Sequence, residues 1–194
     1  MSMLRVIGGT AARRKLKAPR SAAVRPTTDR VKETLFNILG PQVIGATFLD
    51  LFAGSGSVGI EAASRGASQV TLVDQAAAAL GCLRENLAAL EIENAEVLRL
   101  RLPQGLRGSW LSGAPFDLLF IDPPYDSPLA EATLATLAEE PGLTAVGCTV
   151  VVQHESRRQL PETIGAFQQF RRCVVGSTSL TFFRRADSLA NALK

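Results

Sequence analysis

Cysteine and histidine are scarce in this sequence. It contains three cysteines, Cys82, Cys148 and Cys173, with no CxxC spacing, and a single histidine, His154. An odd number of isolated cysteines among apolar neighbours does not form a disulfide framework and is typical of proteins from a reducing compartment. We therefore expect a cytoplasmic protein with free thiols.

The sequence also lacks long apolar runs, internal repeats and low-complexity linkers. Its longest apolar stretches have the length of β-strands, and no basic segment leads into one of them at the amino end. We therefore expect neither a signal peptide nor a membrane span. The 194 residues, 46% of them hydrophobic, are enough for one domain with a full core and too few for two of ordinary size.

Positive charge is unevenly distributed along the chain. The net charge is +3, but residues 1–40 contain nine Lys or Arg and two acids, whereas the remainder contains twelve and sixteen. A basic segment attracts phosphates through counterion release, so the amino end is a candidate nucleic-acid contact. A solvated basic arm is the alternative explanation of the same charge.

Short apolar or β-branched runs alternate with helix-like segments from Thr47 onward. This alternation predicts a doubly wound α/β fold with a mostly parallel, seven-stranded sheet covered on both faces. A join at Gly176 predicts an antiparallel hairpin at one edge. The strands are expected at 47–52, 69–73, 96–100, 116–121, 148–153, 168–175 and 178–184. One helix is expected to follow the turn at 53–56 and to end at residue 65, and two others to span 75–90 and 128–140.

Three segments divide the chain. We expect a basic arm or hairpin at residues 1–27, the main domain at 28–185 and a tail at 186–194. The arm has two short runs on either side of Gly8-Gly9. Thr28 or Asp29 then caps an amphipathic helix that opens the main domain.

The first candidate site extends from Asp50 to Gly59, at the end of a predicted strand. Gly54, Gly56 and Gly59 match GxGxxG, in which glycine lets the backbone turn sharply and a ligand approach it. Dinucleotide-binding folds share this pattern, and a tight turn needs glycine even without a ligand. Asp50, however, would repel a pyrophosphate and attract the cationic sulfonium of S-adenosylmethionine. We therefore expect S-adenosylmethionine as the cofactor.

Asp74 ends the next predicted strand. In doubly wound sheets, ligands bind outside the carboxyl ends of the strands, and a carboxylate at this place accepts hydrogen bonds from ribose hydroxyls. Asp74 therefore fits a nucleoside cofactor of either kind.

The most specific motif is Asp122-Pro123-Pro124-Tyr125, directly after an apolar strand. Two prolines fix the backbone and leave the Pro123 carbonyl as an acceptor beside the Asp122 carboxylate. Two acceptors can hold both hydrogens of an exocyclic base amine and direct its lone pair at a methyl group, while Tyr125 stacks on the base. This chemistry depends on placement and desolvation, and it needs neither a metal nor a covalent nucleophile.

The Asp122 loop resembles the [D/N]PP[Y/F/W] loop of class I amino-methyltransferases that act on nucleic acids. Three further motifs, in the same order, resemble the RsmD-type 16S ribosomal RNA guanine-N2 methyltransferases. They are RVIGG and RKL within residues 5–16, RPTTDRVKETLFN at 25–37, and DLFAGSGSVG with Glu61 and SRGA at 50–67. The likeness covers roughly residues 4–155.

The resemblance implies a Rossmann-like class I methyltransferase fold and a monomeric bacterial enzyme. Its substrate would be 16S ribosomal RNA within a partly assembled small ribosomal subunit, and its target base would leave the stack to be held by residues 122–125. The implied S-adenosylmethionine contacts are Thr28, Asp50, Phe52, Ala53, Gly54, Ser55, Gly56, Gly59, Asp74, Gln75 and Asn86. The implied RNA contacts are Arg5, Arg13, Arg14, Lys15, Lys17, Arg25 and Arg30.

The sequence departs from the family in places. The family commonly has Glu at the position of Asp74 and a glycine where Ala12-Arg13 stands. After the third predicted strand, residues 99–103 offer no obvious partner for adenine, so the adenine contacts are unassigned. We do not expect His154 to act as a general base. Core packing, rather than RNA stacking, is expected of Trp110, Phe167, Phe170, Phe182 and Phe183.

Three other functions would explain part of these motifs. A DNA adenine-N6 or cytosine-N4 methyltransferase would use the same acceptor loop, but this chain has little room for a target-recognition insertion. A nicotinamide-dependent oxidoreductase would use the glycines and Asp74, and would leave residues 122–125 without a purpose. A non-catalytic RNA-binding protein on the same fold would not need the intact motifs.

Overall fold

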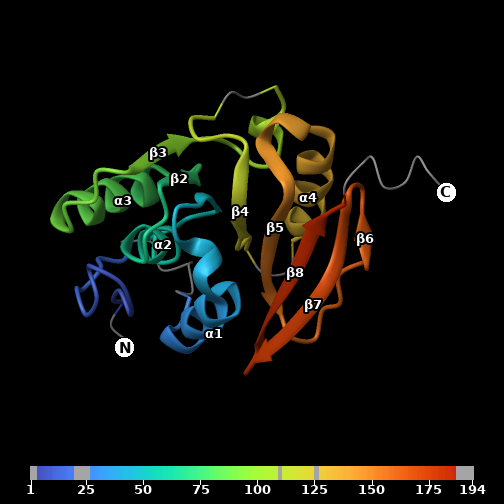
Figure 1. Cartoon of the computed structure of the whole chain (residues 1–194). Helices are drawn as coiled ribbons and strands as arrows, with labels where there is room; N and C mark the ends of the chain where they lie inside the picture. The colour runs from blue at the N-terminus through green and yellow to red at the C-terminus, as the bar shows by residue number, and fades with distance from the viewer. Residues whose placement is uncertain (1–3, 20–26, 109–110, 125–126, 187–194) are drawn as a thin grey trace.

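The protein is built on one eight-stranded sheet. The computed structural model describes residues 4–19, 27–108, 111–124 and 127–186. The strand order is β3-β2-β1-β4-β5-β8-β7-β6 (Figure 1). The strands are β1 (Thr47–Leu51), β2 (Gln69–Asp74), β3 (Ala95–Arg99), β4 (Phe116–Ile121), β5 (Thr144–Glu155), β6 (Thr163–Ile164), β7 (Phe167–Val175) and β8 (Thr178–Arg185).

The first five strands are parallel and the last three are antiparallel. β3, β2, β1, β4 and β5 pair in parallel, and β8 then pairs antiparallel with both β5 and β7. The predicted Rossmann-like class, with its antiparallel edge hairpin, is confirmed. The sheet has one strand more than the seven predicted, because β6 is only two residues long and too short to show a periodicity.

Four α-helices connect or flank the strands. They are α1 (Asp29–Leu39), α2 (Gly59–Ser64), α3 (Ala77–Ala89) and α4 (Leu129–Glu139), and the short 3-10 helices are η1 (Gly40–Val43), η2 (Gln104–Leu106) and η3 (Pro141–Leu143). Thr28 caps α1 as predicted, since its hydroxyl accepts a hydrogen bond from the Val31 amide at 3.4 Å. The cap matters because the first amides of a helix have no partner within it.

Both faces of the sheet are covered. Phe48 and Phe120 belong to an apolar cluster that includes side chains of α1, α2 and α3. Leu49 and Leu119, their neighbours along the strands, belong to a second cluster with side chains of α4. Successive side chains of a strand point to opposite faces, so strands covered on both faces are nearly all apolar. Each fully buried Phe or Leu contributes about 1.5–3 kcal/mol to the stability of this core.

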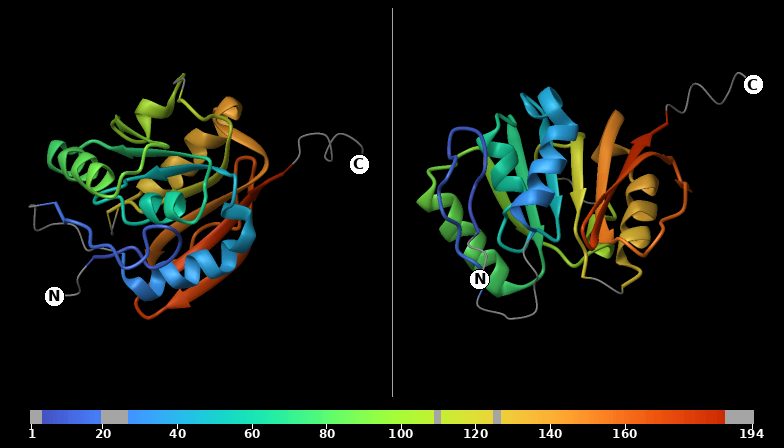
Figure 2. Two further views of the ribbon diagram at one scale, coloured as in Figure 1. Left: turned by 60° about the vertical axis from the view of Figure 1, so that its left-hand side comes forward. Right: turned by 90° about the horizontal axis from the view of Figure 1, so that it is seen from below.

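The amino-terminal segment forms the predicted small hairpin. Arg5 and Lys15 make an isolated antiparallel bridge, and the Val6 amide donates to the Arg14 carbonyl at 2.9 Å. The turn of the hairpin contains Arg13 with a φ of 70°. This left-handed conformation is one that glycine adopts without strain. Both views of Figure 2 show the hairpin, in dark blue, beside α2 and α3.

Within the described ranges, no helix combines the length and the apolar character that crossing a membrane requires. Residues 20–26 of the predicted arm and 187–194 of the predicted tail lie outside the described residues.

Candidate active site

The candidate site lies where the strand order reverses. β1 lies between β2 and β4. From β1 the chain continues to β2 and β3 on one side of the sheet and then returns to β4 and β5 on the other. In open α/β sheets, ligands bind outside the carboxyl ends of the strands at such a switch point. Three carboxylates predicted for the site come from these strand ends: Asp50 in β1, Asp74 at the end of β2 and Asp122 directly after β4.

The glycine turn after β1 is held from both sides by carboxylates. The Gly59 amide donates to Asp50 Oδ2 at 2.8 Å, and the Gly54 amide donates to Asp74 Oδ2 at 2.9 Å. Phe52, at the start of the turn, has a φ of 65°, and Gly54 has a φ of 57°. The two aspartates therefore fix both ends of a turn that the backbone would not otherwise favour.

Gly56 and Gly59 are required by close packing inside the protein. A Cβ on Gly56 would lie 2.5 Å from a methyl group of Leu83, and one on Gly59 would lie 2.4 Å from a methyl group of Leu72. Gly56 also has a φ of 79°. Two of the three glycines of the GxGxxG pattern thus have a structural reason that does not depend on a ligand.

Asp50 is held mostly in its protonated form at neutral pH. Burial, assisted by the nearby charges of Asp122 and Asp74, raises its pKa to about 8, and the hydrogen bond from the Gly59 amide opposes the shift. An organic cation next to these three carboxylates would favour their ionised forms. The electrostatics of the turn therefore fit the positively charged methionine end of S-adenosylmethionine.

Asp74 has free hydrogen-bonding capacity and partial exposure. Besides the bond to Gly54, its Oδ1 accepts from the Ala76 amide at 2.9 Å. An ionised carboxylate has about four acceptor positions, so two remain for hydroxyl groups of a ligand. Gln75, the next residue, is exposed. Both are placed at the carboxyl end of β2, where a ribose would lie.

The acceptor loop begins at Asp122, which is anchored on three sides. Its amide donates to the Leu51 carbonyl at 3.3 Å, and its Oδ2 accepts from the Thr27 hydroxyl at 3.2 Å. Burial raises the pKa of Asp122 to about 7, while hydrogen bonds from Thr27 and Gln153 oppose the shift. The charge of Asp122 also raises the pKa of Asp50, so the two carboxylates lie close enough to interact.

The loop that contains the two prolines is held by hydrogen bonds with residues at the start of α4 and after β5. Pro123 is buried and Pro124 is exposed, and the Pro124 carbonyl accepts from the Ser127 hydroxyl at 2.7 Å. Arg158 donates to the Ser127 carbonyl at 2.7 Å and to both carboxylate oxygens of Glu131 at 2.8 and 2.6 Å. The loop is therefore held from its carboxyl side too. Tyr125 lies outside the described residues.

A cavity of about 440 Å³ opens beside the two prolines. It is lined by Pro123 and Pro124, the start of α4, the end of β5 from Gln153 to Glu155, and Arg157 and Arg158. Its size is within the range of small-molecule sites. The sequence motifs do not predict it, because half of its lining residues come from the end of β5 and the segment that follows, which no motif covers.

Thr28 and Asn86 occupy positions with structural tasks. The Thr28 hydroxyl caps α1, as described above. Asn86 is buried, and its Nδ2 donates to the carbonyls of Ser55 and Lys17, each at 3.0 Å, while its Oδ1 accepts from the Lys17 amide at 2.8 Å. Asn86 therefore ties the arm to the glycine turn, and its predicted role as a cofactor contact stays a prediction.

The basic residues of the arm differ in how much of their charge is free. Arg5 pairs with Asp29, and Lys17 pairs with Glu85, each at 2.8 Å. The Arg14 guanidinium donates to the Ala89 carbonyl at 2.6 Å. Arg13, in the turn, and Lys15, at the bridge with Arg5, are exposed, as is Arg30 in the first turn of α1. Arg25 lies outside the described residues.

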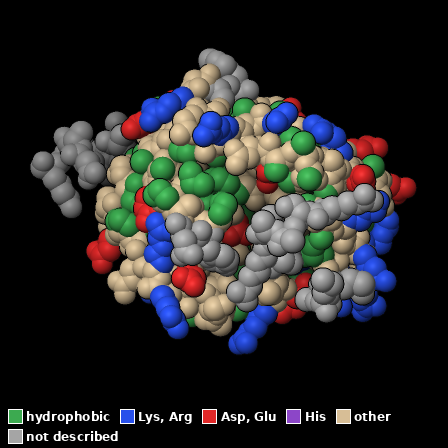
Figure 3. Space-filling model, turned by 180° about the vertical axis from the view of Figure 1, so that it is seen from behind, with side chains coloured by type: hydrophobic (Ala, Val, Ile, Leu, Met, Phe, Trp, Pro, Cys, Tyr) green, Lys and Arg blue, Asp and Glu red, His purple; other side chains and the backbone are tan. Residues whose placement is uncertain are grey.

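Lysine and arginine side chains are not confined to the arm. On the face seen from behind, they lie around the rim, and hydrophobic side chains gather between them (Figure 3). Among the exposed large hydrophobic residues is Phe170, which is 48% exposed and lies 4.8 Å under the Arg184 guanidinium. The core position expected for the Phe residues is confirmed for Phe167, Phe182 and Phe183 and is wrong for Phe170. Trp110 lies outside the described residues.

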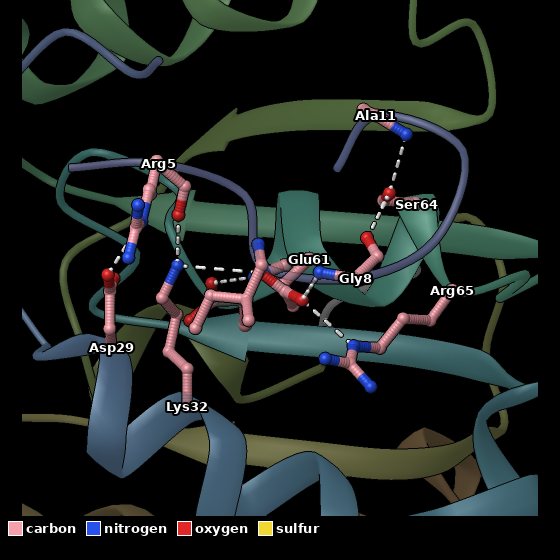
Figure 4. Close-up of polar contacts among 11 residues, drawn as sticks. Arg5, Gly8, Ala11, Asp29, Lys32, Glu61, Ser64 and Arg65 are labelled. Carbon is pink, nitrogen blue, oxygen red and sulfur yellow. Dashed lines mark hydrogen bonds and ion pairs between the residues drawn. The ribbon is translucent and has the colours of Figure 1, made fainter. Parts of the chain in front are cut away.

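A buried ionic cluster joins the arm to the helix that follows the glycine turn (Figure 4). Glu61 of α2 accepts from the amides of Ile7 and Gly8 at 2.8 and 2.7 Å and pairs with Arg65 at 2.8 Å. The Lys32 side chain of α1 is fully buried, pairs with Glu61 at 3.4 Å and donates to the Arg5 carbonyl. Burial lowers the pKa of Lys32, and the charge of Glu61 opposes this.

Ser64 continues this junction one turn further along α2. Its hydroxyl donates to the Gly8 carbonyl at 2.6 Å and accepts from the Ala11 amide at 2.9 Å (Figure 4). A Cβ on Gly9 would lie 1.8 Å from the Ser64 carbonyl oxygen, so only glycine fits there. The arm is therefore packed onto the main domain, through residues that sequence reasoning identified only as parts of a motif.

His154 is a buried structural residue in this geometry. Its ring nitrogens contact the Thr181 hydroxyl at 2.8 Å and the Glu155 carbonyl at 2.9 Å. Burial lowers its pKa, which favours the neutral ring.

Comparison with known proteins identifies the family. The family described as Conserved hypothetical protein 95 matches residues 4–184. Ribosomal RNA small subunit methyltransferase D of Escherichia coli K12 is 38% identical over 182 residues, covering 94% of this chain and 90% of its own. The chain belongs to this RsmD-type family. The matched residues include the arm as well as the sheet, so the junction of Glu61 and Lys32 lies within the family's shared region.

Other known proteins are similar to this one over most of the chain. Ribosomal RNA small subunit methyltransferase D of Haemophilus influenzae is 41% identical over 144 residues, which are 70% of this chain and 71% of its own. The solved structure of yhhF from Escherichia coli has a TM-score of 0.84 and 36% identity, covering 95% and 98% of the two chains. An RNA methyltransferase from Salinibacter ruber, solved with S-adenosyl-L-homocysteine, shares the fold with a TM-score of 0.63 at 15% identity.

Proposed function

We propose that this protein methylates the N2 amino group of a guanine in 16S ribosomal RNA, with S-adenosylmethionine as the methyl donor. The observation that carries the proposal is the position of Asp122, a carboxylate anchored by Thr27 and Gln153 beside the Asp50 turn. The names of the small-subunit RNA methyltransferases related to this chain support the same substrate.

The glycine turn and Asp74 would hold the cofactor. When bound, S-adenosylmethionine supplies an electrophilic methyl group on a sulfonium. Asp50 contributes negative charge below the turn, and Asp74 offers acceptors to the ribose. Phe52, Ala53, Ser55 and Gln75 complete the predicted wall of this cofactor site.

The acceptor loop would hold the base. Ionised Asp122 and the Pro123 carbonyl would each accept one hydrogen of the amine. This pulls the nitrogen towards a tetrahedral form, so that its lone pair is less delocalised into the ring and points at the methyl group. Tyr125 would stack on the base. Fixing amine and methyl group at contact distance in a site that excludes water can lower the barrier by about 7–11 kcal/mol in favourable cases. Water takes the proton that the methylated amine releases.

The arm would bind RNA phosphates through Arg13 and Lys15, which are exposed. Arg5, Arg14, Lys17, Arg25 and Arg30 complete the predicted contact set. We further propose that the protein acts as a monomer on a partly assembled subunit, since the target guanine must be reachable and free to leave its stack.

The proposal is tested with methyl-labelled S-adenosylmethionine and four substrates: small subunits without base methylation, partly assembled particles, naked 16S RNA and duplex DNA. Digestion to nucleosides identifies the product. We expect label in N2-methylguanosine from RNA substrates and none with the Asp122→Ala variant. Label only in N6-methyladenine or N4-methylcytosine from DNA would overturn the proposal.

A further inference from the structure

Gln153 lies beside Asp122 at the carboxyl edge of the sheet. β4 and β5 are parallel, and Ile121 is paired with Val152, so the next residues of the two strands, Asp122 and Gln153, are neighbours. Gln153 is 3% exposed, and its side chain is hydrogen-bonded to the Asp122 carboxylate. It also lines the 440 Å³ cavity together with Pro123 and Pro124.

The bond to Asp122 sets the orientation of the Gln153 amide. An ionised carboxylate can only accept hydrogen bonds, so the amide must turn its Nε2 toward Asp122. Its Oε1 then points elsewhere, and this buried oxygen has no hydrogen-bond partner in the described part of the chain. A buried acceptor without a partner is unfavourable and uncommon in folded proteins. This one belongs to a residue that lines the cavity, where a donor on a ligand would satisfy it.

We propose that Gln153 selects guanine by accepting the hydrogen on N1 of the target base. This inference rests on the proposed function and adds the residue that distinguishes the base. In guanine, the ring nitrogen N1 beside the exocyclic amine carries a hydrogen. The corresponding ring nitrogens of adenine and cytosine carry none and are acceptors.

Three acceptors would then face three hydrogens in a row. Asp122 and the Pro123 carbonyl take the two amine hydrogens, and Gln153 Oε1 takes the N1 hydrogen. Adenine or cytosine in the same position would place a ring acceptor against Oε1, leaving both without a partner. Sites that bury a polar group for one substrate strongly reject analogues that lack its partner.

The test compares guanine with 2-aminopurine at the methylated position. That position is first mapped in RNA treated with the wild-type protein, and RNA is then prepared by ligation with either base there. 2-Aminopurine keeps the amine but has no hydrogen on N1. We expect the wild-type protein to methylate guanine at least about tenfold faster in single-turnover reactions, the equivalent of one lost hydrogen bond.

Gln153→Met keeps the length of the side chain and removes both polar atoms. It should slow guanine methylation and reduce the guanine to 2-aminopurine ratio by about tenfold. Thr27→Val is the matched control, because Thr27 also donates to Asp122 but has no second polar atom for the base. It should slow both substrates alike and leave the ratio unchanged.

The possible outcomes distinguish a failure of the role of Gln153 from a failure of the proposed function. Calorimetric binding of S-adenosylmethionine shows whether the variants are folded, and Gln153→Leu serves as a second variant. A wild-type ratio near one, or an unchanged ratio in folded Gln153 variants, overturns the role of Gln153 while the proposed function stands. A wild-type protein that methylates no guanine in RNA overturns the proposed function itself.

Discussion

Asp122 has to satisfy two opposing requirements. In its proposed role it must be ionised to accept hydrogens from an amine, but burial raises its pKa to about 7. Thr27 and Gln153 donate to the carboxylate and so limit the shift. Burial of the Asp122 carboxylate therefore places its ionisation close to neutral pH.

The first prediction follows from this pKa. The ionised fraction of Asp122 should increase from about one tenth at pH 6 to about nine tenths at pH 8. We expect the single-turnover rate of RNA methylation to increase with pH. Because the bound sulfonium favours the ionised carboxylate, the midpoint should lie near 7 at subsaturating S-adenosylmethionine and at a lower pH at saturation. A rate that is independent of pH from 5 to 8 at both concentrations would contradict the acceptor role of Asp122.

Asp122→Asn gives the second prediction. Asparagine has nearly the same shape but presents an amide that can donate against the base amine. Loss of an acceptor that acts on the reacting group should reduce the rate about 100-fold or more, with S-adenosylmethionine affinity changed less than about threefold. Asp117→Asn, at the other end of β4, is the control for loss of one carboxylate and should keep full activity.

Asp50 gives a prediction about stability. Its pKa is about 8 in the folded protein, whereas an ordinary exposed aspartate has a pKa of 3.8, so folding takes up a proton between these values. Asp50 therefore favours the folded state at low pH, and this contribution is lost as the pH increases through 8. Denaturant unfolding at pH 5 and pH 8.5 should show a smaller pH dependence in Asp50→Asn than in the wild-type protein. An equal dependence in both would assign the effect to other groups.

At the scale of elements, the junction between the arm and α2 is the contact that local sequence patterns do not predict. Lys32 and Glu61 are 29 positions apart, and each is a charged residue, for which exposure is the usual outcome. By contrast, the sequence predicts β1, β2 and β4 nearly to the residue, because apolar runs directly encode strands buried on both faces. Pairing between distant charges depends on the tertiary arrangement, which no local pattern contains.

The fourth prediction concerns this junction. Glu61→Gln leaves Lys32 buried without a counterion, which should lower the free energy of unfolding by about 3–5 kcal/mol. The amides of Ile7 and Gly8 should also exchange their hydrogens faster. Glu33→Gln, on the exposed face of α1, removes the same charge and should change the stability by less than about 0.5 kcal/mol. Equal losses in the two variants would contradict the role of the buried pair.

At the scale of the whole molecule, the charge asymmetry of the sequence and the positions of the charges in the fold do not fully coincide. The amino end is basic, as the sequence shows, but part of that charge is engaged by Asp29 and Glu85. The carboxylates of the cofactor turn account for part of the negative remainder. The sequence alone predicts a nucleic-acid contact at the basic amino end. Only the fold shows which of its Lys and Arg side chains are engaged in ion pairs.

The fifth prediction uses the salt dependence of RNA binding. Arg13→Ala/Lys15→Ala should weaken binding to 16S RNA and reduce the slope of log K against log salt by about 1.4–1.8, as expected for two lost phosphate contacts. Arg107→Ala/Arg171→Ala removes the same charge from exposed positions outside the arm. Fluorescence anisotropy at several salt concentrations measures both. An equal loss of slope in the control would show that RNA contacts are not concentrated at the arm.

The position of Glu61 also bears on engineering. It lies two positions after Gly59, the last glycine of the turn after β1, and both belong to the six-residue α2. A designer who grafts this arm onto another methyltransferase would therefore have to transfer α2 with it, together with Lys32 from α1. Swapping the arm alone would leave unsatisfied amides at Ile7 and Gly8 and disturb the support of the glycine turn.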